Sequence, residues 1–458
     1  MCHVAIRTTA STVARSRVAR PLRPRSTWSY SCHVAQVVFA TMGSWGDLFP
    51  TIGLAKAMAA RGHAVRLATT SAYASLVEDE GLRFVPAGPR FGPDEFAADP
   101  AILDGRQGGY AGFLHLFRTV VFPNLIAWVE DLRGSLEDAD LLVSHPTVLA
   151  SPIAAELTAT RWATFSVFPG LIPSEHTLPS PTRARLPGGP MSRAMCRSAW
   201  RTARWNIRRS FDPAVDAARV AFGLSRARDA LFLPIESGNP YLVGASPRVV
   251  DAPPDWPANI QLTGFFAWDT PRSYRPPDGL RKFFEAGPAP ILITLGGSSA
   301  VDPQQFYPNA VRATRRLGHR ALVLGGPTPE PIRLDPSPDT YVLPFAPLSQ
   351  IGPRCLAAIQ HGGIGTTVGL LAAGLPQLIV PRGFDQPQTA LRMSRLGVAT
   401  ITPWSRASAP ALERALANLL STDGYRHRAS AFATWLEQER GLDNAADALE
   451  QALTLTSP

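Results

Sequence analysis

Cysteine is scarce in this chain of 458 residues. Only four cysteines are present, and no two of them form a CxxC pair. They are Cys2, Cys32, Cys196 and Cys355. Such scattered cysteines support neither a zinc site nor a disulfide framework. A reducing cytoplasm is therefore the expected location of the protein.

Long hydrophobic runs are missing as well. The longest apolar run, residues 368–380, has 13 residues and contains Pro376 and Gln377. A helix needs about 18 apolar residues to cross a bilayer. The sequence therefore predicts no transmembrane helix.

Lysine is almost absent, with 2 lysines against 43 arginines, and the formal net charge is +9. Six of the arginines lie in residues 1–35, which hold no acidic residue. This segment lacks the apolar core of a secretory signal, although its Arg- and Ser-rich composition also fits a transit peptide. We interpret residues 1–35 as a disordered tail or a mis-assigned start, and the rest of the chain is close to neutral.

The remaining composition is that of a globular protein, with 18% charged and 45% hydrophobic residues. At about 150 residues per domain, the length predicts two or three domains. From residue 36 onward, short β-rich runs alternate with helix-period segments, which predicts an α/β fold with parallel sheets. The expected strands are 36–41, 63–70, 141–145, 162–167, 291–296, 321–326, 340–345, 356–361 and 377–381.

A stretch at residues 251–290 is rich in proline, aspartate and aromatic residues and has little periodicity, as expected of an inter-domain connection. We predict an N-terminal domain at residues 36–250, with an insertion at 169–228, and a C-terminal domain at residues 251–458. The predicted architecture is two doubly wound, Rossmann-like domains that face a cleft.

The strongest motif is a glycine-rich turn between an expected strand and an expected helix. Gly362, Gly363 and Gly365 follow the strand, and Thr366 and Thr367 open the helix. Backbone N–H groups and a helix N-terminus then point at one spot, which favours phosphate binding. No lysine follows the glycines, and a valine replaces the third glycine of the dinucleotide fingerprint, so neither of those phosphate loops applies. The alternative is a purely structural βα turn.

A second motif, GSWGDLFP at residues 43–50, follows the first expected strand. It carries Asp47 at the carboxyl end of that strand, where open α/β sheets form their ligand crevices. A carboxylate there is a candidate general base for a hydroxyl group. Asp is also a favoured helix N-cap, and Pro50 suits a first helical turn, so the alternative is that Asp47 only caps a helix.

Together the two motifs resemble those of a known family. His361-Gly-Gly-x-Gly-Thr-Thr, followed by Asp385-Gln386, resembles the donor-binding signature of GT-B glycosyltransferases in the UDP-glycosyltransferase superfamily. The segment at residues 43–50 resembles the N-terminal motif of the bacterial and sterol-type branch. That branch includes sterol glucosyltransferases, glycopeptide glycosyltransferases and rhamnolipid rhamnosyltransferases. The resemblance covers nearly all of the chain after residue 36.

The resemblance implies a nucleotide-sugar site in the C-terminal domain. His361 would hydrogen-bond the diphosphate. Further N–H and hydroxyl donors to it are expected from Gly363, Gly365, Thr366 and Thr367. Gln360 departs from many relatives, which carry a second histidine at this position.

Other contacts to the donor are implied in the same way. Asp385 and Gln386 would hold the hydroxyls of the donor sugar, and Phe345 would stack on the nucleobase. Ser298 would lie near the phosphates, a role that Ser299 fits almost as well.

The implied activity is that of an inverting hexosyltransferase that needs no metal and no cofactor. It would move a hexose from a UDP- or dTDP-linked sugar to a hydroxyl of an apolar acceptor: a lipid, sterol, terpenoid or polyketide. Asp47 would be the base, and a helix N-terminus with His361 would stabilise the departing diphosphate. Two alternatives are a catalytically silent auxiliary partner of another glycosyltransferase and a non-hydrolysing sugar-nucleotide epimerase.

Weaker candidates complete the set. Trp45 and His145 are expected to line the acceptor pocket, or else to pack within the core. Five arginines share one face of an expected helix, near Trp200 and Trp205. They are Arg193, Arg197, Arg201, Arg204 and Arg208. This face is either solvated or in contact with the inner face of a membrane, whereas no signature of nucleic-acid binding accompanies the charge.

Overall fold

The computed structural model describes residues 34–42, 45–90, 92, 110–180, 186–297, 303–326, 332–335, 337–383 and 385–454. The predicted tail at residues 1–35 lies outside this part of the chain, apart from Val34 and Ala35. Residues from Ala35 onward form one unit, which contains two parallel sheets. The predicted fold class is therefore confirmed.

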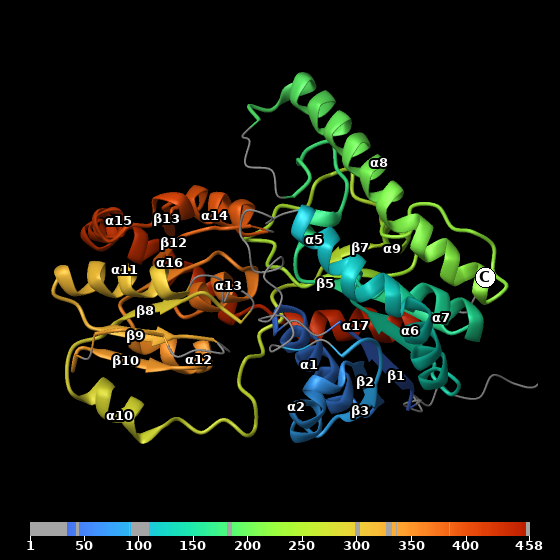
Figure 1. The fold of residues 1–458 in the computed structure, drawn as a ribbon, viewed down its shortest axis with the longest axis horizontal. Helices are drawn as coiled ribbons and strands as arrows, with labels where there is room; N and C mark the ends of the chain where they lie inside the picture. Colours follow the sequence, from blue (N-terminus) through green and yellow to red (C-terminus); the bar gives the residue numbers. More distant parts are fainter. Residues whose placement is uncertain are drawn as a thin grey trace, which may run out of the picture. The chain divides into compact units, whose positions relative to one another are not determined.

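The first lobe is built on a seven-stranded parallel sheet with the strand order β3-β2-β1-β4-β5-β6-β7 (Figure 1). Its strands are β1 (Gln36–Ala40), β2 (Ala64–Thr69), β3 (Arg83–Pro86), β4 (Leu141–Ser144), β5 (Arg161–Ser166), β6 (Tyr241–Val243) and β7 (Ile260–Leu262). In the central strand β1, Val37, Val38 and Phe39 are fully buried, and alternate residues face two different hydrophobic cores. A strand covered on both faces requires such a continuous apolar run.

Helix α1 of this lobe begins earlier than the sequence predicts. The motif at residues 43–50 is expected to be a turn, whereas α1 spans Trp45–Ala60 and contains Pro50. A proline at this place removes one backbone hydrogen bond but does not end the helix. The other helices are α2 (Ala74–Asp79), α5 (Tyr110–Leu116), α6 (Phe122–Ser135), α7 (Ala150–Thr158), α8 (Gly189–Ala221) and α9 (Leu233–Glu236).

Helices α5 and α6 are joined by a π-helical stretch, Phe117–Val121, into one helix of 26 residues. By length and composition this helix is apolar enough to cross a membrane, and 39% of its most apolar window is buried within the protein. It does not stand out in the sequence as an unbroken apolar run; a buried core helix meets the same criteria, so the absence of a transmembrane helix stays a prediction. Phe117, Val121 and Leu125 are buried in the core of the first lobe, which accounts for part of the apolar composition.

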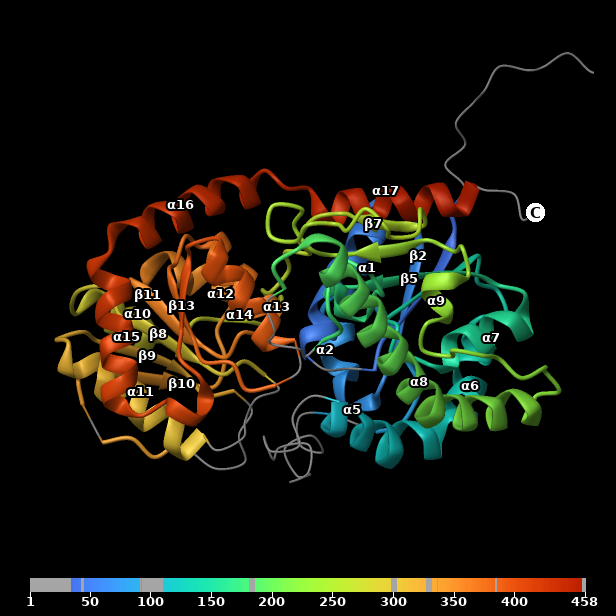
Figure 2. The ribbon, with the colours of Figure 1, turned by 90° about the horizontal axis from the view of Figure 1, so that it is seen from above.

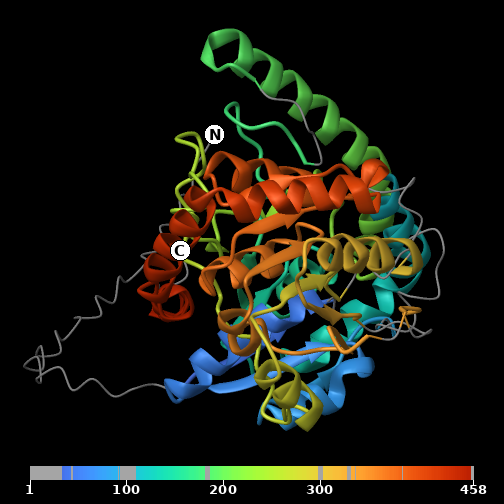
Figure 3. The same cartoon turned by 90° about the vertical axis from the view of Figure 1, so that its left-hand side faces the viewer.

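Helix α8 is one helix of 33 residues within the predicted insertion at residues 169–228. Figure 3 shows its N-terminal end extending away from both sheets.

The second lobe is a six-stranded parallel sheet with the order β10-β9-β8-β11-β12-β13. Its strands are β8 (Ile291–Thr294), β9 (Ala321–Leu324), β10 (Thr340–Leu343), β11 (Ala357–Gln360), β12 (Gln377–Ile379) and β13 (Ala399–Ile401). Its helices are α10 (Asp278–Glu285), α11 (Pro303–Arg316), α12 (Leu348–Ile351), α13 (Ile364–Ala372), α14 (Gln386–Arg395), α15 (Ala409–Ser421) and α16 (Asp423–Glu437).

The last helix, α17 (Gly441–Thr454), returns to the first lobe, where it packs against α1 and β5. Figure 2 shows the chain crossing between the lobes from α16 to α17. Strand β7 also belongs to the first sheet, since it pairs with β6. Strand β7 and helix α17, which both fall within the predicted C-terminal domain at residues 251–458, therefore pack with the first lobe.

Candidate active site

Both sheets end at one cavity of about 1030 Å³. Its lining residues follow the carboxyl ends of strands in both lobes, which is where ligand crevices of open α/β sheets form. Of the predicted site residues, the first lobe contributes Trp45, Asp47 and His145. The second lobe contributes Phe345, His361, Gly363, Gly365, Thr366, Asp385 and Gln386.

The ring of His361 lies between two glycines. A Cβ atom at Gly296 would come within 2.6 Å of the His361 Cε1 atom, and one at Gly363 within 2.5 Å of Nε2, so both positions require glycine. His361 is 5% exposed, and burial lowers its pKa to about 4, which makes the ring neutral at pH 7. Its Nδ1 atom is buried and has no hydrogen-bond partner among the described residues, whereas most buried polar groups are bonded.

The first turn of α13 opens into the cavity beside His361. A Cβ atom at Gly365 would meet no other atom within 4 Å, and Thr366 lines the cavity. Backbone N–H groups at the start of a helix attract an anion placed there. The predicted phosphate-binding turn thus lies where the sequence motif puts it.

Thr367 points away from this cavity, so its predicted side-chain contact to the diphosphate is wrong. It is fully buried, and its Oγ1 accepts a hydrogen bond from Gln360 Nε2 at 3.0 Å. Its N–H donates to the Gly363 carbonyl at 2.9 Å. Successive helical residues are about 100° apart around the axis, so Thr366 and Thr367 cannot face the same way.

Gln360 supports the glycine turn from behind. Its Oε1 accepts a hydrogen bond from the Gly362 N–H, and its Nε2 also donates to Gln377 Oε1 at 2.9 Å. Gln377 Nε2 in turn donates to the Thr367 carbonyl at 2.9 Å. The position at which many relatives carry a second histidine therefore holds the turn in place and contributes no group to the cavity.

The Asp385 carboxylate contacts the first residue of α13. Burial raises the pKa of Asp385 to about 6; hydrogen bonds from the N–H groups of Asp385 itself and Ile364 act against this rise, and the negative charge of Asp47 adds to it. Ile364 is the first residue of α13. The carboxylate expected to hold the sugar is thus bonded to the helix N-terminus and lies within electrostatic reach of Asp47 in the other lobe.

Gln386 is nearly buried at the start of α14. Its Oε1 accepts hydrogen bonds from the N–H groups of Arg382 and Gly383 at 2.9 and 3.2 Å. The side-chain oxygen that is predicted to bind a sugar hydroxyl therefore already holds the preceding turn.

Phe345 is part of an aromatic cluster in the cavity. It stacks on Trp45 with 6.0 Å between ring centroids, and the rings of Phe49 and Tyr274 meet it edge-on. One face of the ring that is predicted to stack on a nucleobase is thus covered by the Trp45 indole. Ser298 and the adjacent Ser299 lie outside the described residues.

Asp47 is the third residue of α1, which starts at Trp45. The alternative that Asp47 is the N-cap is therefore wrong, because the N-cap precedes the first helical residue. Asp47 Oδ1 lies 3.4 Å from His145 Nε2.

His145, which follows β4, is held between two side chains. Its Nδ1 lies 2.7 Å from Thr147 Oγ1, opposite the contact with Asp47. Burial lowers the pKa of His145, and the Asp47 carboxylate acts in the other direction. Thr147 also lines the cavity, although the sequence does not single it out. The sequence pattern around Thr147 is a hydroxyl residue two positions after a histidine at a strand end. This pattern is too common to predict a site residue without knowledge of the fold.

The part of the cavity formed by α5, α8 and the residues after β5 is apolar. The apolar side chains there are Phe113, Leu116, Phe168, Leu171 and Ile207. This lining offers burial to a hydrophobic ligand rather than charge.

The five arginines of the predicted basic face lie on α8, but most of them form ion pairs within the chain. Arg197 lies 2.6 Å from the Glu175 carboxylate, and Arg204 lies 2.8 Å from the Asp229 carboxylate. Further pairs join Arg193 to Glu175 and Arg208 to Asp212 and Asp229. The basic charge of this face is therefore largely balanced by acidic groups of the first lobe.

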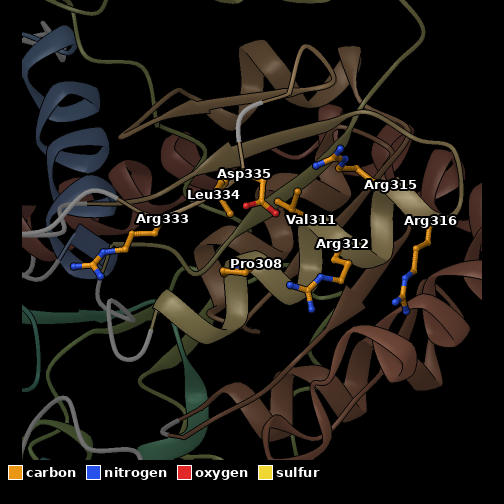
Figure 4. A pocket seen from close by; sticks show the side chains of 8 residues that line it. All are labelled: Pro308, Val311, Arg312, Arg315, Arg316, Arg333, Leu334 and Asp335. Carbon is orange, nitrogen blue, oxygen red and sulfur yellow. The ribbon is translucent and has the colours of Figure 1, made fainter.

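A second hollow, of about 420 Å³, lies on α11 and residues 333–335 (Figure 4). It is lined by Pro308, Val311, Arg312, Arg315, Arg316, Arg333, Leu334 and Asp335. None of the predicted site residues contributes to it. Two of its arginines, Arg315 and Arg316, lie in the last turn of α11, where cations complement the helix dipole.

Replacing Gln360 by alanine should lower the free energy of unfolding by about 1–3 kcal/mol, because the buried Gly362 N–H and the Gln377 amide lose their partner. Urea unfolding measures this change. Gln350→Ala, at an exposed position of α12, is the matched control and should be close to neutral. Equal losses in the two variants would contradict the role assigned to Gln360.

Comparison with known proteins agrees with this geometry. Residues 37–103 match the family described as "Glycosyltransferase family 28 N-terminal domain". Residues 334–439 match the family described as "Erythromycin biosynthesis protein CIII-like, C-terminal domain".

Two curated relatives cover most of the chain. It is 30% identical over 427 residues to O-mycaminosyltylonolide 6-deoxyallosyltransferase of Streptomyces fradiae. The matched region covers 91% of this chain and 97% of that protein. It is 28% identical over 433 residues to a sterol 3-beta-glucosyltransferase of Arabidopsis thaliana. The matched region covers 90% of this chain and 65% of that protein.

Solved structures share the fold. The calicheamicin glycosyltransferase CalG4 superposes with a TM-score of 0.68 at 18% identity, over 93% of this chain and 100% of that one. The glycosyltransferase VinC, solved in complex with dTDP, gives a TM-score of 0.64 at 18% identity, over 91% of this chain and 99% of that one. With the 30% identity over nearly its whole length, the chain belongs to the GT-B glycosyltransferases of the UDP-glycosyltransferase superfamily.

Proposed function

We propose that this glycosyltransferase moves a hexose from a UDP- or dTDP-linked donor to a hydroxyl of an apolar acceptor, with inversion at the anomeric carbon. The observation that carries the proposal is the distribution of groups around one cavity. Asp47 and His145 lie in the first lobe, and His361 lies beside the first turn of α13 in the second. A base and a diphosphate site on opposite walls are what a single in-line displacement requires.

The donor class is supported by the relatives. One of them is named a 6-deoxyallosyltransferase and another a glucosyltransferase, and VinC and SsfS6 were solved with thymidine diphosphate. The acceptor class is supported by the apolar part of the cavity next to α5 and α8. Natural products and sterols both fit this description.

We infer that Asp47 is the base and that His145 is a positioning residue. The two ring nitrogens of His145 are directed at Asp47 and Thr147. The Asp47 side chain is 20% exposed, against 10% for His145, so the carboxylate is the more open member of the pair.

In the proposed step, Asp47 takes the proton of the acceptor hydroxyl while the acceptor oxygen bonds to the anomeric carbon. The bond from that carbon to the diphosphate oxygen breaks, and its electron pair leaves with the nucleoside diphosphate. The N–H groups at the start of α13 and His361 stabilise the leaving group. Transfer without a metal is part of the proposal, and among the described residues no group of three or more His, Cys, Asp or Glu side chains could hold a metal ion.

The two alternative functions account for less of the cavity. An epimerase acts on the sugar nucleotide alone, so the apolar part of the cavity formed by Phe113 and Ile207 would bind no substrate. A catalytically silent partner of another glycosyltransferase has no use for the Asp47–His145 pair.

We also propose that α8 contacts an anionic membrane surface at the inner face of the membrane, through its outward stripe. Met191, Met195 and Trp205 are 75%, 50% and 58% exposed, and Arg209 lies over the Trp205 ring at 4.9 Å. These four residues fall at positions i, i+4, i+14 and i+18, so they share one side of the helix. Aromatic, apolar and cationic side chains together suit a membrane interface.

Asp47→Asn should lower turnover by about two to four orders of magnitude, the contribution of a positioned general base, and leave donor affinity unchanged. Steady-state kinetics and calorimetry measure the two quantities. The matched control is Asp79→Asn, at an exposed position of α2 outside the cavity.

His145→Gln should retain far more turnover than Asp47→Asn, because glutamine still offers an N–H to Asp47. If His145 were the base, His145→Gln would lose at least as much activity as Asp47→Asn. That result would overturn the assignment of the base.

His361→Ala should weaken binding of the nucleoside diphosphate by about 1.5–3 kcal/mol, the usual value of a hydrogen bond to a charged group. Calorimetric titration with UDP and dTDP measures the loss. His427→Ala, at an exposed position of α16, should bind as the wild type does. Unchanged affinity in His361→Ala would remove this histidine from the donor site.

The membrane proposal predicts that the protein co-sediments with vesicles of phosphatidylcholine and phosphatidylglycerol at low salt, but not with phosphatidylcholine alone. Replacing Trp205 and Arg209 together by serine and glutamine should reduce this binding. Arg193→Gln, within the paired face, should change it little. Absence of co-sedimentation at low salt would contradict the proposal.

A further inference from the structure

The indole nitrogen of Trp45 is a buried hydrogen-bond donor. Trp45 Nε1 has no hydrogen-bond partner among the described residues, although the residue lines the cavity. Buried indole N–H groups usually find a partner. His361, which lines the same cavity, also has a ring nitrogen, Nδ1, without a hydrogen-bond partner among the described residues.

Both rings pack on one turn, Gly296–Gly297, which follows β8. A Cβ atom at Gly297 would lie 2.9 Å from Trp45 Cδ1, the ring atom bonded to Nε1. A Cβ atom at Gly296 would lie 2.6 Å from His361 Cε1, the ring atom next to Nδ1. The pyrrole edge of Trp45, from the first lobe, thus packs on Gly297, and the ring of His361, from the second lobe, packs on the adjacent Gly296. No other residue type at these glycines would allow both approaches.

Apart from the contact with Gly297, the indole ring of Trp45 is surrounded by aromatic side chains. The indole stacks on Phe345 and meets the rings of Phe49 and Tyr73 edge-on, at 5.0 and 6.0 Å. These contacts stabilise the ring but offer no oxygen to its N–H. An oxygen-rich ligand in the cavity would supply the missing acceptor.

We propose that Trp45 is a donor-binding residue of the first lobe, whose Nε1–H donates to a phosphate oxygen of the nucleotide sugar. This inference rests on the proposed function. It assigns to Trp45 a contact with the donor in place of the acceptor contact expected from the sequence. Trp45 lies in the same helical turn as Asp47, so a donor held by this N–H also touches the turn that carries the proposed base.

The test is the affinity of three variants for dTDP and UDP, measured by calorimetric titration. Trp45→Phe keeps an aromatic ring on Phe345 and removes the N–H. Trp256→Phe is the matched control, since Trp256 Nε1 is also buried without a partner among the described residues but lies outside the cavity. Incorporation of benzothienylalanine at position 45 keeps the shape of the indole and replaces its N–H by sulfur.

We expect Trp45→Phe and the benzothienylalanine variant to bind the diphosphates at least about tenfold more weakly, as for the loss of a hydrogen bond to a charged group. Trp256→Phe should bind as the wild type does. Thermal unfolding without ligand checks the fold of Trp45→Phe, and the isosteric variant decides the outcome if that substitution is disruptive.

Three results have distinct meanings. Wild-type affinity in both position-45 variants would overturn the inference, and so would tighter binding, which would show that the indole merely obstructs the site. Absence of nucleoside diphosphate binding in the wild-type protein would instead refute the proposed function itself.

Discussion

Parallel pairing in both sheets is the constraint on which the rest of the structure depends. Strands that pair in parallel all run in one direction, so their carboxyl ends lie at the same edge of the sheet. Asp47 and His145 therefore meet although β1 and β4 are far apart in the sequence, because the two strands are neighbours. The same holds in the second lobe for the turns after β8 and β11, between which His361 is held.

Close backbone approach is what makes the second-lobe wall rigid. Gly296 and Gly363 admit the His361 ring, and the buried amides of Gln360 and Gln377 fix the turn between them from behind. Donors held in this way need little rearrangement to receive an anion, and electrostatic stabilisation of this kind is a large part of catalysis. Burial also keeps His361 neutral, so it acts as a hydrogen-bonding group rather than as a permanent charge.

The fold was largely predictable from the sequence, because apolar runs such as residues 36–41 and glycine turns such as residues 362–365 are local signals. The orientation of Thr367 was not, since it depends on the exact phase of α13. The pairing of Arg197 with Glu175 and the return of α17 to the first lobe depend on contacts between distant residues. The partnership of His145 with Asp47 is of the same kind, and only strand order reveals it.

The central claim is that the cavity between the two sheets binds a nucleotide sugar against α13 and His361. The most direct measurement is the unfolding temperature of the wild-type protein with a panel of nucleoside diphosphates. A ligand that binds only the folded state at 100 times its Kd adds about 2.7 kcal/mol of stability. We expect a clear rise of the unfolding temperature with UDP or dTDP and little change with the free nucleoside. No protection by any nucleoside diphosphate would contradict it.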